Sequence, residues 1–284
     1  MTVQVEVIFD LHRFFTFQED ITMDAKEYLA NYYEQYDEDG RLLSKHGKIE
    51  YITTMRYIEK YLKPGMRVLE IGAATGRYSH ALAQKGYQVD AVELVEHNIE
   101  IFKQNTLPGE NVTITQGNAM DLSAFANDTY DITLLLGPMY HLFTTEDKLK
   151  AVSEAIRVTK KGGIVFAAYC MGDASVLSYG FIRGEIYSII EKCMLNTETF
   201  DTFSNPWDIF ELHRKEDIDN LRSRFNVTQL HFVASDGYTN HMRATVDNMD
   251  DRMYEIYVKY HLAICERQDM VGYSHHTLDI FRKE

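Results

Sequence analysis

Cysteine, positive charge and long apolar runs are all scarce in this 284-residue sequence. The three cysteines, Cys170, Cys193 and Cys265, lie far apart and lack the spacing of a disulfide framework or a metal site. Free cysteines in this number are typical of a reducing compartment. We therefore expect a cytoplasmic protein.

Positive charge is outweighed by negative charge. The sequence has 29 Lys and Arg residues against 43 Asp and Glu residues, which gives a formal net charge of -14. Binding that neutralises many phosphates needs a cation at each contact, so this balance disfavours nucleic acid as a partner. Only a local basic patch would change that expectation.

No apolar run is long enough to span a membrane. The most apolar stretch, 132–136, is far shorter than the roughly 20 residues that a membrane helix needs. The opening residues 1–17 contain Glu6 and Asp10, and no basic segment precedes a continuous apolar one. We expect neither a secretion signal nor a membrane association.

What the sequence does contain is enough apolar material, 45%, for a sizeable core in one large domain. From residue 67 onward, short apolar stretches alternate with helical spacing. The expected strands are 67–71, 88–92, 112–115, 131–136, 164–169, 227–233 and 277–281, and helices are expected at 77–85, near 95–102 and near 149–156. Such alternation with short links predicts an α/β fold with a parallel, doubly wound sheet.

Further helices flank this alternating region. They are expected over 24–36, which is rich in tyrosine, over 48–62, within 171–222 and over about 249–264. Residues 1–22 show no clear period. We expect an N-terminal arm and cap helix over 1–46, followed by one domain over 47–284 that carries helical insertions at about 171–222 and 240–268.

The central stretch of the chain runs from Val68 to Ser79. A buried strand ends near the acid Glu70, meets a loop bounded by Gly72 and Gly76, and opens into a helix. Backbone amides in such a loop can approach a ligand closely. The loop has no Walker lysine, and its glycines lack the Gly-x-Gly-x-x-Gly spacing of nicotinamide folds. A carboxylate here instead favours a ligand that carries an ammonium group or another donor.

Residues 68–161 resemble the class I S-adenosylmethionine-dependent methyltransferases, within a match that covers about 36–169. The cofactor loop of that family, Glu-x-Gly-x-Gly-x-Gly, is matched by Glu70, Gly72, Ala74 and Gly76. Gly-Pro-Met-Tyr-His-Leu at 137–142 resembles the small-molecule group, in which this motif follows the fourth strand. Ala74 replaces the middle glycine, which is tolerable at negative φ but hinders close backbone approach at positive φ.

The resemblance implies a Rossmann-like sheet of seven strands, mostly parallel with an antiparallel last strand, and S-adenosyl-L-methionine as the cofactor. Glu93 would accept hydrogen bonds from the ribose, Asn118 and Ala119 would hold the adenine, and main-chain carbonyls after the fourth strand would face the ammonium. The expected cofactor-binding residues are Glu70, Gly72, Ala73, Ala74, Gly76, Glu93, Leu94, Asn118, Ala119, Leu136 and Gly137.

The implied chemistry is an in-line displacement at the sulfonium methyl group, in which the enzyme aligns the acceptor and excludes water. His141 is the candidate general base and Tyr140 the candidate orienting hydroxyl. The expected substrate residues are Tyr32, Tyr36, Tyr140 and His141. Two readings stay open beside these. His141 could be a structural histidine near the helix start at 144–145, and the tyrosines of 28–36 could simply pack that helix on the sheet.

The acceptor is expected to be a small molecule with an oxygen or nitrogen nucleophile. The Asn/Asp-Pro-Pro-Tyr/Phe motif of nucleic-acid amino methyltransferases is absent, as is a Pro-Cys nucleophile. No metal site is expected, because His275 and His276 point to opposite faces of a strand. Two alternatives are a regulatory protein that binds the cofactor without catalysis and an RNA or protein methyltransferase.

Overall fold

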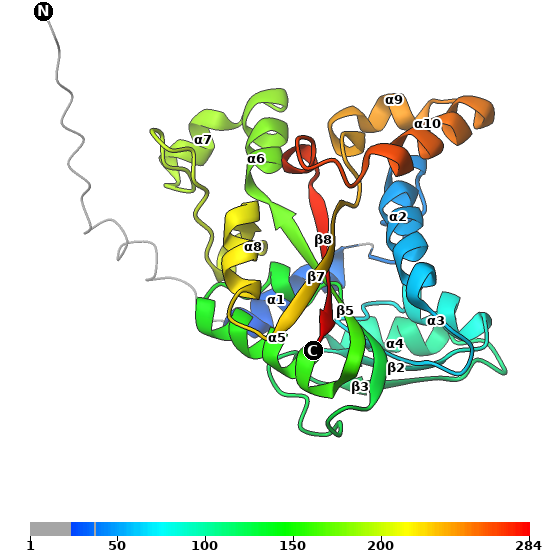
Figure 1. The fold of residues 1–284 in the computed structure, drawn as a ribbon. Helices are drawn as coiled ribbons and strands as arrows, with labels where there is room; N and C mark the ends of the chain where they lie inside the picture. The colour runs from blue at the N-terminus through cyan, green and yellow to red at the C-terminus, as the bar shows by residue number, and fades with distance from the viewer. Residues whose placement is uncertain (1–23, 37) are drawn as a thin grey trace, which may run out of the picture.

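The computed structural model describes residues 24–36 and 38–284 (Figure 1). The expected N-terminal arm at 1–22 lies outside this range. The described part contains one eight-stranded sheet in the order β3-β2-β1-β4-β5-β8-β7, with β6 paired to β5. The strands are β1 (Arg67–Ile71), β2 (Gln88–Glu93), β3 (Val112–Gln116), β4 (Tyr130–Leu135), β5 (Thr159–Met171), β6 (Leu212–His213), β7 (Val227–Ala234) and β8 (His276–Lys283).

The expected α/β fold is confirmed, and the strand pairing shows how it is wound. β1 lies between β2 and β4, and all of β1 to β5 run parallel. β8 is the antiparallel strand, inserted between β5 and β7. The structure adds β6 to the seven expected strands; two residues are too few to leave a periodic signal in the sequence.

The helices lie on both faces of this sheet (Figure 1). They are α1 (Ala25–Gln35), α2 (Lys45–Tyr61), α3 (Arg77–Gln84), α4 (Glu96–Asn105), α5 (Thr145–Val158), α6 (Gly172–Ser175), α7 (Ile186–Glu191), α8 (Lys215–Arg222), α9 (Arg243–Asp247) and α10 (Asp251–Ile264). Short turns η2 (Pro138–Tyr140), η4 (Pro206–Asp208) and η5 (Thr239–Met242) and a π-helix, η3 (Val176–Ile182), connect some of them.

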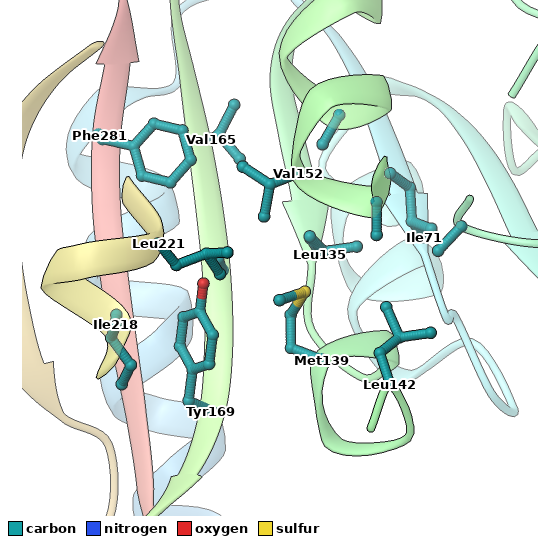
Figure 2. Packing of buried hydrophobic residues seen from close by; sticks show 14 of the residues in the cluster. Ile71, Leu135, Met139, Leu142, Val152, Val165, Tyr169, Ile218, Leu221 and Phe281 are labelled. Carbon is teal, nitrogen blue, oxygen red and sulfur yellow. The ribbon is translucent and has the colours of Figure 1, made fainter. Parts of the chain in front are cut away.

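Alternate residues of β5 show how the core is divided. Val165 and Tyr169 join the cluster on the face covered by α5 and α8, where Val152 and Leu221 meet them (Figure 2). Phe166 and its i±2 neighbours join the opposite cluster, which contains buried residues of α2 and α3. A strand buried on both faces is why 164–169 is a continuous apolar run.

The insertion at 171–222 is less helical than expected. Helices and helical turns cover 172–182, 186–191 and 215–222, whereas 192–214 is mostly irregular. α7 ends at Glu191, so the helix does not extend to Met194. Cys193 adopts φ +56°, a left-handed conformation that a helix cannot continue through.

No helix among the described residues is long and apolar enough to cross a membrane.

One buried ion pair fixes the antiparallel part of the sheet. The Asp279 side chain on β8 is 1% exposed, and both of its oxygens accept from Nη1 of Arg222 on α8, at 2.8 and 2.7 Å. Gln229 on β7 donates to the same carboxylate at 3.0 Å. Through these contacts the Asp279 carboxylate joins β8 to both α8 and β7.

We predict that Arg222→Ala lowers the free energy of unfolding by about 3–5 kcal/mol, because it leaves the Asp279 carboxylate buried without its cation. Urea denaturation measures this. Arg224→Ala, at an exposed position in the next turn, should change stability by less than about 0.5 kcal/mol. Equal effects of the two variants would show that the buried pair does not stabilise the fold.

Candidate functional site

The expected cofactor residues lie at one edge of the sheet. β1, β2, β3 and β4 are parallel, so the segments that follow them, 72–76, 94–95, 117–119 and 136–137, emerge at the same edge. The strand order reverses between β1 and β4. In open α/β sheets, ligands bind in the crevice at such a reversal, outside the carboxyl ends of the strands.

The loop after β1 requires glycine at both of its ends. Gly72 has φ +75°, and a Cβ there would lie 2.6 Å from Cδ of Pro138 in η2. Gly76 has φ +92°, and a Cβ there would lie within 2.6 Å of the His80 and Phe102 rings. The loop is therefore packed tightly between η2 and the helices α3 and α4.

Ala74 lies in the left-handed region, at φ +47°. The sequence left open whether φ at this position is negative or positive, and the structure has it positive. The Cβ of alanine adds a steric cost at positive φ, so the backbone is strained. The strained backbone is held in place by a hydrogen bond from the Ala74 N–H to Oε2 of Glu93, at 2.8 Å.

Glu93 connects this loop to the turn after β2. Its Oε1 accepts from the Val95 N–H at 2.9 Å while Oε2 holds Ala74. The side chain is buried, and burial raises its pKa although the backbone hydrogen bonds act in the opposite direction. The Asn98 side chain and the Leu94 N–H act on the carboxylate in the same direction, so most of its roughly four acceptor positions are taken and a ribose hydroxyl would share or replace one of these donors.

Glu70 lies beneath the loop. It is 2% exposed, and the Ser79 hydroxyl of α3 donates to its Oε2. Burial raises the pKa of Glu70 to about 8. A cation near this carboxyl would lower its pKa, because the cation favours the ionised form.

The remaining expected cofactor residues make contacts of different kinds. Oδ1 of Asn118, the atom assigned to adenine from the sequence, accepts from the Met120 N–H at 2.9 Å. Ala119 is buried in the core, and the Gly137 carbonyl accepts from the Tyr140 N–H at 3.1 Å. Leu94 lines a hollow described next, together with Gln116.

Helix α1 lies over this edge and separates two hollows. The first, about 270 Å³, is the edge hollow, between α1 and the ends of β2 and β3. It is lined by Asp24, Lys26, Glu27, Ala30, Leu94, Val95, Glu96 and Gln116. The second, about 370 Å³, is the aromatic hollow, and its lining residues are Tyr28, Asn31, Tyr32, Gln35 and Tyr36.

The tyrosines of α1 face other helices and turns as well as these hollows. Tyr32 stacks on Tyr36 with ring centroids 5.4 Å apart, and its edge meets Phe210 at 6.0 Å. Tyr28 meets Trp207 of η4 at 5.3 Å. No residue of α1 is fully buried, so the helix does not pack flat on the sheet.

His141 follows η2 and contacts α1. Its Nδ1 lies 2.8 Å from the Ile209 carbonyl oxygen and its Nε2 lies 2.9 Å from the Tyr33 hydroxyl. Burial lowers its pKa to about 4, so the imidazole is neutral at physiological pH. The cap of α5 is Thr144, whose hydroxyl accepts from the Asp147 N–H. His141 therefore does not cap that helix, but its two hydrogen bonds also fit the structural histidine considered from the sequence.

Tyr140 points to different surroundings. It is 8% exposed within the cluster that contains Tyr78 of α3, and its ring lies 6.0 Å from that of His276. Burial raises its pKa well above the usual range. The structure thus brings His141, and not Tyr140, to the tyrosines of α1.

An ion network that the sequence did not predict lies near Tyr140 and includes His276. Arg41 donates to both oxygens of Glu50, at 2.7 and 3.2 Å, and Nδ1 of His276 lies 2.7 Å from Asp236 and 3.4 Å from Glu50. These groups come from four separate segments, so no local pattern could reveal them. Tyr33 was also missed as a partner of His141, 108 positions away.

The ligand atoms of Glu50, Asp236 and His276 lie within 4.8 Å of one another, a spacing that a metal ion could use. The charges and hydrogen bonds oppose that reading, because the Arg41 guanidinium already occupies both oxygens of Glu50. His276 is held protonated, since the two carboxylates raise its pKa well above the usual value despite burial. His275 points elsewhere, to Ser178 at 2.7 Å.

Comparison with known proteins bears on this edge of the sheet. Residues 68–163 match the family model for the methyltransferase domain. This methyltransferase segment covers β1 to β4 and α5, and it contains every cofactor residue expected from the sequence. It makes up about a third of the chain.

The curated relatives match over different lengths of the chain. Demethylmenaquinone methyltransferase of Staphylococcus aureus is 32% identical over 108 residues, which are 37% of this chain and 43% of that protein. A ubiquinone biosynthesis O-methyltransferase of Stutzerimonas stutzeri is 22% identical over 198 residues, 68% of this chain and 83% of that protein. The chain spans less than half the length of the first curated relatives that it matches.

A solved structure shares the fold. The S-adenosylmethionine-dependent methyltransferase of Methanosarcina mazei aligns with 80% of this chain and 96% of its own, with a TM-score of 0.52 and 16% identity. At this identity the likeness is one of fold alone.

The strain at Ala74 gives a testable prediction. Ala74→Gly should raise the free energy of unfolding by up to about 1 kcal/mol, because glycine adopts positive φ without the steric cost of Cβ. Urea denaturation measures the change. Ala73→Gly, at a neighbouring position of negative φ, should lower stability instead. The same sign for both variants would contradict the strain.

Proposed function

We propose that this chain is an S-adenosylmethionine-dependent methyltransferase that acts on a small molecule through an oxygen or nitrogen nucleophile. The observation that carries the proposal is the Glu93 carboxylate. It holds the glycine loop and the turn after β2 together at the reversal point of the sheet, beside the edge hollow. The match of residues 68–163 to methyltransferase domains supports it.

In this proposal each part of the edge has one task. Glu93 accepts from the ribose hydroxyls, Asn118 and Ala119 flank the adenine, and the 72–76 loop lies against the amino-acid end. Glu70 lies beneath that loop with a pKa of about 8, so an ammonium group nearby would favour its ionised form. The cofactor supplies an electrophilic methyl group on a sulfonium.

The protein aligns the acceptor, excludes water and removes a proton where the acceptor carries one. Helix α1 provides the cover, since it lies over the edge hollow and also forms the wall of the aromatic hollow. His141 is neutral, so the ring nitrogen that carries no proton can take one up. The aromatic walls, Tyr32 and Tyr36 among them, suit a flat acceptor.

The first prediction from this proposal concerns binding. Calorimetry should show S-adenosylmethionine and its demethylated product binding at one site. Glu93→Gln should weaken both by about 10-fold or more, because a charged acceptor of ribose hydrogen bonds becomes a neutral one. Glu100→Gln, exposed on α4, is the matched control and should bind as the unchanged protein does. Binding unaffected by Glu93→Gln would argue against the site.

The second prediction concerns transfer. With a methyl-labelled donor and a metabolite extract, His141→Ala should lower the rate of transfer about 100-fold, whereas His231→Ala, on the far strand β7, should not. In the unchanged protein the rate should stay level from about pH 8 down to about pH 5. The folded pKa of about 4 lies below the ordinary value, so His141 is protonated only in stronger acid.

A fall in rate centred near pH 6.5 would contradict a buried neutral base at this position. Binding without transfer to any component of the extract would favour the regulatory alternative. Transfer to RNA or to protein would replace the small-molecule acceptor.

A further inference from the structure

Both ring nitrogens of His141 are engaged. The Ile209 carbonyl can only accept a hydrogen bond, so Nδ1 carries the proton. In the neutral imidazole, Nε2 is then the nitrogen with the free lone pair. Its partner at 2.9 Å is the Tyr33 hydroxyl, which must therefore donate. This assignment of the tautomer follows from the hydrogen bonds.

The Tyr33 hydroxyl lies on the one ring nitrogen of His141 that could act as a base. Nε2 is the only atom of the neutral ring that can take up a proton, and the Tyr33 hydroxyl occupies it. The hydroxyl oxygen of Tyr33 still has lone pairs that can accept from another group.

Tyr33 also lies beside the aromatic hollow. Its ring centroid is 5.3 Å from that of Tyr32 and 6.3 Å from that of Tyr36, and both of these tyrosines line the hollow. Burial and the negative charge of Glu38 and Glu93 raise its pKa well above the usual range. Its hydroxyl therefore keeps a proton at physiological pH, as a group that passes protons onward must.

We propose that Tyr33 relays the proton of the methyl acceptor to His141. The acceptor O–H or N–H donates to the Tyr33 oxygen, and as its proton moves there, the original Tyr33 proton moves to Nε2. The bond from the acceptor to the methyl carbon forms while the bond from that carbon to sulfur breaks. The imidazolium that results donates to Ile209 through Nδ1 and to Tyr33 through Nε2.

This relay rests on the proposed methyl transfer but makes a separate claim. A purely structural role is the competing explanation, in which the bond between Tyr33 and His141 only docks α1 over the edge. The two explanations differ in what the hydroxyl affects. A relay governs the transfer step, whereas docking governs how well the cofactor is held.

The test is Tyr33→Phe, which keeps the ring against Tyr32 and Tyr36 and removes only the hydroxyl. Tyr254→Phe is the matched control, because it also removes one tyrosine hydrogen bond, to the Lys45 carbonyl at 2.8 Å, between α10 and α2. Transfer of labelled methyl from saturating S-adenosylmethionine into a metabolite extract is measured together with calorimetry of S-adenosylhomocysteine.

We expect Tyr33→Phe to lower the transfer rate about 100-fold with the product affinity changed less than 2-fold. We expect Tyr254→Phe to match the unchanged protein in both. Nitrogen NMR of the His141 ring gives a readout that needs no acceptor, since loss of the donor should shift the Nε2 resonance.

Three results would overturn the relay. The first is an unchanged transfer rate in Tyr33→Phe with product binding also unchanged. The second is an unchanged Nε2 resonance. The third is weaker product binding with the transfer rate intact at saturating donor, which would leave docking of α1 as the role of the hydroxyl. If the unchanged protein binds no S-adenosylhomocysteine, the methyltransferase proposal fails and the relay fails with it, whatever the NMR shows of the contact.

Discussion

The candidate site depends on the contact of Glu93 with two backbone N–H groups. One is at Ala74, in the loop after β1, and the other is at Val95, after β2. A buried carboxylate needs such donors, since an unsatisfied charge would be costly there. The contact also stabilises a backbone conformation that alanine adopts only under strain. Loop shape, strand spacing and a carboxylate at the crevice therefore arise from one interaction.

Most of the sheet could be predicted from the sequence because parallel strands buried on both faces leave continuous apolar runs. Strand 67–71 has the bounds of β1, 112–115 ends one residue before β3 does, and 131–136 is shifted by one residue relative to β4. Expected site residues gather at one edge because strand direction alone brings them there. Local patterns were sufficient wherever the relevant partner was a neighbour in the chain or the next strand.

The prediction was incomplete where partners are distant. The φ of Ala74 depends on packing against Glu93, so the sequence could only state two cases. Tyr33 stood among several tyrosines, and only the fold shows that it reaches His141. The irregular structure of 192–214 was not predicted either, because its apolar residues pack on α1 and the sheet without a regular period.

The network of Arg41, Glu50, Asp236 and His276 has a consequence for biosynthesis. Glu50 leaves the ribosome long before Asp236 and His276, the second of which lies on β8, have been made. Until then the cation of Arg41 alone balances Glu50. A nascent chain that ends before His276 therefore lacks the two groups that complete this network, so α2 can be joined to β8 and to the turn after β7 only once those segments have been made.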